Sequence, residues 1–226
     1  MDLNIVLLLV GLHNMHSHPL ELGAVFQPDW DERPIRVLAF DDREVMYDVW
    51  WPHKNAWGLA NFRGTTTYYR IPTPFLLERG RYVRTDSYTT SEAQLHRPDL
   101  PLSFGRCAAL NWSEDRPSTI AELAEQLITG GCANTRQTSK NLLAVPVVYL
   151  CPFGPKGGSK PGTPIHAKDG EAFTAAELLW HAWDLQAPHL REPLLTQGVG
   201  LYRSGVQRQK PSYYIWGARS MAEGAG

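Results

Sequence analysis

The most basic stretch of the chain lies near its C-terminal end and combines cations with aromatic rings. Between Gly198 and Ser220 there are four cations, four aromatic residues and four glycines, and no Asp or Glu. Guanidinium groups bind phosphate in a bidentate manner, and aromatic rings stack on unpaired bases. We therefore predict that this segment contacts nucleic acid through Arg203, Arg208, Lys210, Arg219, Tyr202, Tyr213 and Tyr214.

Two earlier stretches have a similar composition. One joins Tyr68, Tyr69 and Tyr82 to several arginines, and the other is a polar loop that follows Gly130 and Gly131. The alternative interpretation is that tyrosines pack and arginines are solvated on half-exposed strands. We predict that the contact surface extends to these cations: Arg79, Arg81, Arg84, Arg136 and Lys140.

Two groups of histidines have the residue types that chemistry needs. His13, His16 and His18 follow an H-x-x-H-x-H pattern, and neutral imidazoles at this spacing bind zinc or copper. Only Glu21 lies near them, whereas a closed zinc site needs four ligands. We predict a solvated loop and no metal site, and metal binding by this cluster stays open as the alternative.

His96 and Asp99 are the types of a general base and the carboxylate that orients it. Pro98 separates them, so the two side chains are expected to point in different directions, and no nucleophile lies nearby. The loop 154–164 does not match a phosphate-binding loop, since Pro161 follows Lys160. We predict no catalytic residue and no cofactor.

The overall charge excludes a protein that coats a polyanion along its whole surface. The formal net charge is −1, but acids are concentrated in the first sixty or so residues and cations after Gly130. This asymmetry favours one directed electrostatic face, toward nucleic acid or an acidic partner. Cys107, Cys132 and Cys151 are widely spaced and odd in number, which predicts reduced thiols in a cytoplasmic protein.

The apolar run 5–12 has no Lys or Arg before it and no cleavage pattern after it. It is also too short to span a bilayer. We predict a buried strand here and no contact with a membrane.

The elements that must position these residues follow from local patterns. Asp41, Asp42 and Arg43 predict a hairpin turn, and 78–81 predicts the turn of a second hairpin. Capping boxes predict two main helices at about 119–129 and 175–186, and a shorter one after Thr89. With a buried strand in 141–153 and a last pair of strands after Gly198, the expected fold is α+β with mixed or antiparallel sheets.

The glycine-rich run from Gly198 to Gly205 resembles the C-terminal segment of RAMP-type RNA-binding subunits of class 1 CRISPR effector complexes. That resemblance implies a partly ferredoxin-like fold in which a glycine loop lies close to guide-RNA phosphates. Gln207 stands where the last glycine of the family pattern is expected.

We divide the chain into a β-rich region, 1–115, and an α+β region, 116–226, with one continuous domain as the alternative. The predicted function is a non-enzymatic nucleic-acid-binding subunit of a ribonucleoprotein or DNA-processing assembly, with RNA or DNA and other protein subunits as partners. Trp50, Trp51 and Trp57 would form the docking face for those subunits. The alternatives are a small metal- or His-dependent hydrolase or nuclease, and a structural protein of a virus or mobile element.

Overall fold

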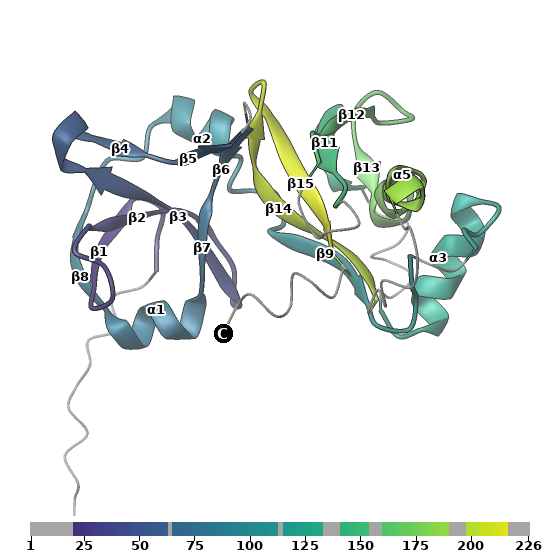
Figure 1. Ribbon diagram of the computed structural model, residues 1–226, viewed down its shortest axis with the longest axis horizontal. Helices are drawn as coiled ribbons and strands as arrows, with labels where there is room; N and C mark the ends of the chain where they lie inside the picture. Colours follow the sequence, from purple (N-terminus) through teal and green to yellow (C-terminus); the bar gives the residue numbers. More distant parts are fainter. Residues whose placement is uncertain are drawn as a thin grey trace, which may run out of the picture.

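The computed structural model describes residues 20–62, 65–112, 115–132, 141–153, 160–189 and 198–216, and it shows the predicted α+β fold. The predicted strand at 5–12 and the histidines at 13, 16 and 18 lie outside these residues. Two sheets dominate the structure and lie side by side in Figure 1.

The first sheet, sheet A, has the order β4-β3-β2-β1-β8, and β7 also pairs with β3. The predicted hairpin between β2 and β3 is confirmed. Its turn forms because the Asp41 carboxylate accepts hydrogen bonds from the backbone N–H groups of Arg43 and Glu44. The strands of sheet A are β1 (Ala24–Pro28), β2 (Ile35–Phe40), β3 (Glu44–Trp51), β4 (Ala56–Gly58), β7 (Tyr69–Pro72) and β8 (Gly80–Thr85).

The second predicted hairpin is wrong, because a helix occupies its first strand and its turn. Helix α1 (Thr73–Arg79) follows β7, with Pro74 in its first turn, where the missing N–H leaves no helical hydrogen bond unmade. Leu76 is fully buried in the core of sheet A. The helix carries the chain across the sheet, so β8 pairs with β1 and not with β7.

The second sheet, sheet B, has the order β12-β11-β15-β14-β6-β5, and β9 also pairs with β14. The predicted final pair of strands, β14 and β15, lies at its centre. A separate pair is formed by β10 (Asn141–Leu143) and β13 (Phe173–Thr174). The strands of sheet B are β5 (Ala60–Phe62), β6 (Thr65–Thr67), β9 (Ser103–Cys107), β11 (Val147–Cys151), β12 (Thr163–His166), β14 (Val199–Gln207) and β15 (Lys210–Trp216).

The three predicted helices are confirmed, and each begins after a threonine cap. Thr89, Thr119 and Thr174 each accept a hydrogen bond from the backbone N–H of the glutamate three residues later. The helices are α2 (Thr90–His96), α3 (Ile120–Thr129) and α5 (Ala175–Gln186), and short 3-10 turns occupy Pro52–Lys54 and Ala187–His189.

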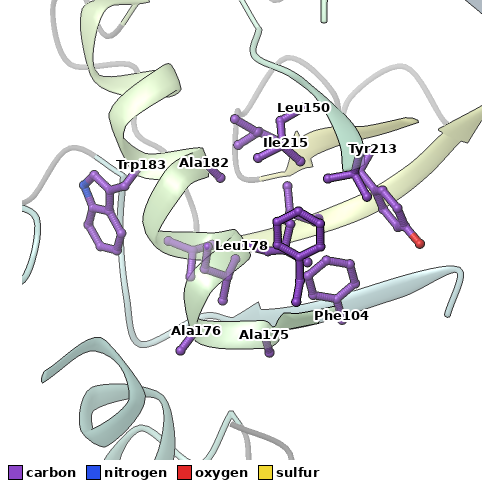
Figure 2. Packing of buried hydrophobic residues seen from close by; sticks show 14 of the residues in the cluster. Phe104, Leu150, Ala175, Ala176, Leu178, Ala182, Trp183, Tyr213 and Ile215 are labelled. Carbon is purple, nitrogen blue, oxygen red and sulfur yellow. The ribbon is translucent and has the colours of Figure 1, made fainter. Parts of the chain in front are cut away.

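The larger core lies between α5 and sheet B, as Figure 2 shows. Leu178 from the helix packs with Leu150 and Ile215 from the strands, and all three are fully buried. Trp183 lies on another side of α5 and packs against Trp112, with the ring centroids 5.1 Å apart. Trp183 is 2% exposed and therefore belongs to this core.

The ferredoxin-like part of the fold prediction is not reproduced. The succession β9, α3, β11, β12, α5, β14 has the β-α-β-β-α-β order of that motif. In the sheet, however, both β14 and β15 lie between β9 and β11, whereas the motif has one strand between such a pair. The C-terminal hairpin enters the sheet as a unit and separates strands that the motif would keep closer.

Pairing in sheet B crosses the predicted boundary at residue 115, because β5, β6 and β9 come before it. A small core shared by the two sheets also joins Leu38 and Met46 of sheet A to Leu102 and Val206. Residues from both predicted regions therefore lie in one sheet, while the division of the chain into domains stays a prediction.

The prediction of three reduced thiols is wrong for two of them. Cys107 and Cys132 form a disulfide across a sequence separation of 25 residues, and Cys151 is free and buried. The reason is geometric, since α3 leads the chain back so that its end lies beside β9. Burial raises the pKa of the Cys151 thiol, which therefore stays protonated at neutral pH.

Candidate nucleic-acid interface

The C-terminal basic segment forms the β14–β15 hairpin, and its first arginine is buried inside the fold. Arg203 is 0% exposed, and its guanidinium donates to the backbone carbonyls of His96 and Arg97 at the end of α2. The carbonyls at a helix C-terminus carry partial negative charge and lack partners within the helix. Arg203 therefore caps α2 and does not face solvent, so we remove it from the predicted interface.

Tyr213 is also buried and belongs to the core of sheet B. Its ring packs edge-on against Phe104 at 5.3 Å, and its hydroxyl donates to the carbonyl of Pro101 at 3.1 Å. In Figure 2 this hydroxyl points away from α5. Burial raises the pKa of the Tyr213 phenol. A fully covered ring offers no face to a base, so Tyr213 also leaves the predicted interface.

Tyr202 and Tyr214 lie opposite each other on β14 and β15 and meet an arginine from sheet A. Their ring centroids are 5.9 Å apart. The Arg70 guanidinium lies 4.8 Å from the Tyr202 ring and 5.3 Å from the Tyr214 ring, and it donates to the Tyr214 hydroxyl at 2.5 Å. Arg70 also pairs with Glu44 at 3.4 Å. The fold thus joins two basic-aromatic stretches that are far apart in sequence, and the arginine between the rings is already neutralised.

The tip of the β14–β15 hairpin presents two cations to solvent. Gln207 pairs with Lys210, and the two residues between them, Arg208 and Gln209, have φ values of 47° and 62°. Two-residue turns of this kind normally contain Asn-Gly, since side chains disfavour positive φ. Arg208 and Lys210 are exposed, and neither has an acidic partner in the described part of the chain.

Arg79, Arg81 and Arg84 lie on α1 and on β8, the edge strand of sheet A. Figure 1 places β8 at the opposite side of sheet A from the hairpin β14–β15. Arg79 pairs with Asp29 at 2.9 Å, and Arg84 pairs with Asp86 at 2.6 Å. Arg81 is exposed. The structure therefore does not bring this group together with the hairpin tip.

Arg136, Lys140 and Arg219 lie outside the described residues. Basic residues outside the predicted set also lie on the surface. Arg43 is exposed in the β2–β3 turn, and His53 and Lys54 are exposed in the β3–β4 turn. The signal for the second pair was the absence of Asp and Glu from the segment 49–58.

His96 is buried, and its environment keeps it neutral. Its Nδ1 lies 3.1 Å from the Tyr68 hydroxyl. Burial and the nearby Arg203 cation lower the pKa of His96 to about 4. Asp99 is bonded by Arg97 and not by His96. Among the described residues, no cluster of three His, Cys, Asp or Glu side chains could hold a metal ion.

The glycine-rich run forms a strand here and not a loop. It makes up most of β14, and Gly205 lies where β6 approaches most closely. A Cβ at Gly205 would lie 1.8 Å from the carbonyl oxygen of Thr66. This glycine is therefore required for strand packing.

Comparison with protein-family models finds no match, and comparisons with curated proteins and with solved structures find none either. The resemblance to RAMP-type subunits has no relative that tests it and stays a prediction. None of the described helices combines the length and the apolar character that crossing a membrane requires.

Proposed function

We propose that the chain is a non-enzymatic nucleic-acid-binding subunit of a larger ribonucleoprotein or DNA-processing assembly, which contacts phosphates through the tip of the β14–β15 hairpin. The observation that carries the proposal is the pair of exposed cations, Arg208 and Lys210, on a turn with two left-handed residues. Such a conformation stores about 1–3 kcal/mol for each non-glycine residue. The arginine at 208 therefore keeps a positive charge at a position where a glycine would make the turn more stable.

The pairing of most of the other described arginines supports this choice of residues. Seven described arginines form ion pairs with carboxylates: Arg33, Arg36, Arg70, Arg79, Arg84, Arg97 and Arg116. An arginine that is already paired gains little from a phosphate, because the acid beside it must first be displaced. Arg208 and Lys210 have no carboxylate partner among the described residues, so they lose none when they bind a phosphate. Because the turn projects from the sheet, it can bring them to a nucleic-acid backbone without a clash.

The test is the salt dependence of binding to labelled 20-nucleotide strands of RNA and of DNA, measured by fluorescence anisotropy. Changing Arg208 and Lys210 together to Ala should flatten the log–log slope by about 1.4–1.8, since each phosphate contact contributes about 0.7–0.9. A double change of Arg43 and Lys168 to Ala is the matched control, because both are exposed and lack an acidic partner within the described residues.

The control should leave the slope within about 0.3 of the native value, by the same counting of contacts. An equal loss in both double variants would mean that only net charge matters and that the tip is no site. Parallel titrations with RNA, DNA and duplex identify the preferred nucleic acid.

The other protein subunits of the assembly would dock on the outer face of α1. Trp30 and Phe75 are 36% and 37% exposed, and their ring centroids lie 5.0 Å apart. The Arg79 guanidinium covers the Phe75 ring at 5.1 Å. Aromatic residues beside arginine are typical of the centres of interfaces. Changing both aromatic residues to Ser should release the chain from its complex on a sizing column without changing its melting temperature.

The cytoplasmic location depends on the state of Cys107 and Cys132. Disulfides are rare in the reducing cytosol and common in oxidising compartments. If the chain works in the cytoplasm, as we propose, alkylation of protein trapped in acid from its native host should label these two cysteines as free thiols. A bonded pair in that experiment would place the chain in an oxidising compartment.

A further inference from the structure

The turn between β3 and β4 combines tryptophans with cations and has no acid of its own. The segment 50–58 reads WWPHKNAWG. Its five central residues, 52–56, are exposed, and Trp50, Trp51 and Trp57 are half-buried at its base. In Figure 1 this turn and the tip of the β14–β15 hairpin both lie along the upper edge of the molecule.

The backbone of this turn fixes the tryptophans in place. Asn55 has a φ of 48° and donates its N–H to the carbonyl of Pro52 at 3.2 Å, which closes the turn. Gly58 allows Trp51 to lie across β4, because a Cβ there would lie 2.6 Å from the indole ring. Two of the rings are therefore held by the strands: Trp51 lies over Gly58, and Trp57 lies opposite Trp50.

Cations lie over the rings of Trp51 and Trp57. The Arg33 guanidinium and the Lys54 ammonium lie 4.9 Å and 5.5 Å from the Trp51 ring. Arg36 lies 5.2 Å from the Trp57 ring, and the Nε1–H of Trp57 donates to Asp86 at 3.1 Å.

In the described part of the chain Trp50 contacts one ring only, that of Trp57, edge-on at 5.3 Å. Trp50 is partly exposed, and a partly exposed aromatic ring is the kind of group on which an unpaired base stacks.

From this placement we infer that the β3–β4 turn is a second contact for single-stranded nucleic acid, in which Trp50 stacks on an unpaired base and Lys54, at the tip of the turn, binds a phosphate of the same strand. The inference rests on the proposed nucleic-acid function. Lys54 is exposed and has no carboxylate partner within the described residues, so its charge is available.

A protein-docking face is less favoured by the same residues. The exposed part of the turn is Pro52, His53, Lys54, Asn55 and Ala56, which offers little apolar area. Interface centres are depleted of lysine, whereas single-strand sites combine cations with stacked rings. We therefore assign Trp50, Trp51 and Trp57 to a base-binding turn in place of the docking face expected from the sequence.

The test compares two probes that share phosphates and differ in bases: a labelled 20-nucleotide oligothymidylate, and the same strand with abasic sites throughout. Trp50→Ala should weaken binding of the oligothymidylate by about 5- to 150-fold, the range measured for loss of one stacked base. Binding of the abasic strand should not change. Trp50→Phe keeps a ring and should recover most of the loss, and Trp180→Ala, which removes another half-buried tryptophan, is the control.

The outcomes separate this inference from the function on which it rests. An equal loss for both probes, or no loss for either, with the melting temperature preserved, overturns base stacking by Trp50. If the salt slope falls in the Arg208 and Lys210 variant while Trp50→Ala binds normally, only the present inference fails. If the native chain binds neither probe, both fail. Loss of subunit association without loss of DNA binding would assign the turn to a protein partner.

Should Trp50→Ala not fold, Lys54→Ala provides the second variant, since an exposed lysine can be removed without disturbing the core. It should flatten the salt slope by about 0.7–0.9 for both probes. An unchanged slope would remove Lys54, and with it the phosphate contact, from the site.

Discussion

Sheet A contains several arginines and the β14–β15 hairpin contains two, Arg203 and Arg208, but the two regions hold them in different ways. In sheet A carboxylates neutralise the guanidinium groups, as where Arg36 lies 2.8 Å from both Asp48 and Glu92. In the hairpin, Arg203 is bound by helix carbonyls, and Arg208 is exposed at the tip with no carboxylate partner among the described residues.

The difference teaches that a basic stretch of sequence is not the same as a basic surface. A cation contributes to binding only when no acid neutralises it and the fold exposes it. Arg79 and Arg84 fail the first condition, and Arg203 fails the second.

The largest effect is expected at Arg203. Arg203→Ala should lower the free energy of unfolding by about 3–5 kcal/mol, because buried carbonyls lose their donors and a large cavity opens. Urea denaturation measures this loss. Arg84→Ala in sheet A is the control and should change stability by less than about 1 kcal/mol, as exposed ion pairs do.

Arg203→Lys sharpens the result further. A lysine retains the charge but lacks the planar fork that reaches two carbonyls, so it should recover less than half of the loss. Full recovery by lysine would show that charge alone, and not capping of α2, explains why an arginine is buried there.

The disulfide is the next largest contribution, and it belongs to the sheet B side of the comparison. Replacing Cys107 and Cys132 by Ser should lower the free energy of unfolding by about 3–4 kcal/mol, because the bond restricts the unfolded chain over its loop. Calorimetry with and without a dithiol measures this difference. The reductant should lower the melting temperature of the native chain and leave that of the double variant unchanged.

Cys151→Ser is the matched control, since Cys151 is a free cysteine. Equal sensitivity of the native chain and the double variant to reductant would show that the bond contributes nothing to stability.

As the pH falls, the contributions of His96 and of Asp48 in sheet A to the free energy of unfolding change in opposite directions. The pKa of His96 falls from 6.5 to about 4 on folding, so the unfolded chain binds the proton more tightly. Its contribution to stability is therefore complete above about pH 6.5 and is lost as the pH falls toward 4, roughly 3 kcal/mol in all. In sheet A, burial raises the pKa of Asp48 to about 6 against the opposing pull of Arg36, and this contribution grows as the pH falls through 6.

Comparing the free energy of unfolding of the native chain with that of His96→Asn isolates the effect of His96, because Asp48 contributes equally to both. The asparagine can still bond to the Tyr68 hydroxyl, which lies close to Nδ1. Chemical denaturation between pH 4 and pH 7.5 should show a steeper loss at low pH for the native chain. Parallel curves would mean that His96 is not held neutral by its surroundings.

The smallest effect is expected at the hairpin tip. Replacing Arg208 and Gln209 by Asn and Gly should stabilise the fold by about 1 kcal/mol, because Asn-Gly is suited to positive φ at both positions. The same change should weaken nucleic-acid binding by removing a cation. If the tip variant is no more stable than the native chain, the positive φ values at Arg208 and Gln209 do not reduce stability.

Local structure could be read from the sequence wherever the signal lies within a few residues. The capping boxes at Thr89 and Thr119 fixed the starts of two helices, since a cap involves only the next turn of backbone. Asp41 fixed the first hairpin by bonding to the N–H groups that follow it. Local signals gave the wrong structure at 73–79, because the sequence of this segment fits a strand as well as a helix. Only the pairing of β8 with β1 decides between the two.

What only the tertiary structure decided is which of these residues meet and which are covered. Burial of Arg203 required α2 to end beside β14, and the bond between Cys107 and Cys132 required α3 to return to β9. The contact of Arg70 with Tyr202 and Tyr214 likewise joins residues more than a hundred positions apart, as the Arg70–Tyr214 separation of 144 shows. Composition determined that cations and rings were present. Pairing over such distances, which no local pattern encodes, decided that Arg203 and Tyr213 are buried while Arg208 and Lys210 are exposed at the hairpin tip.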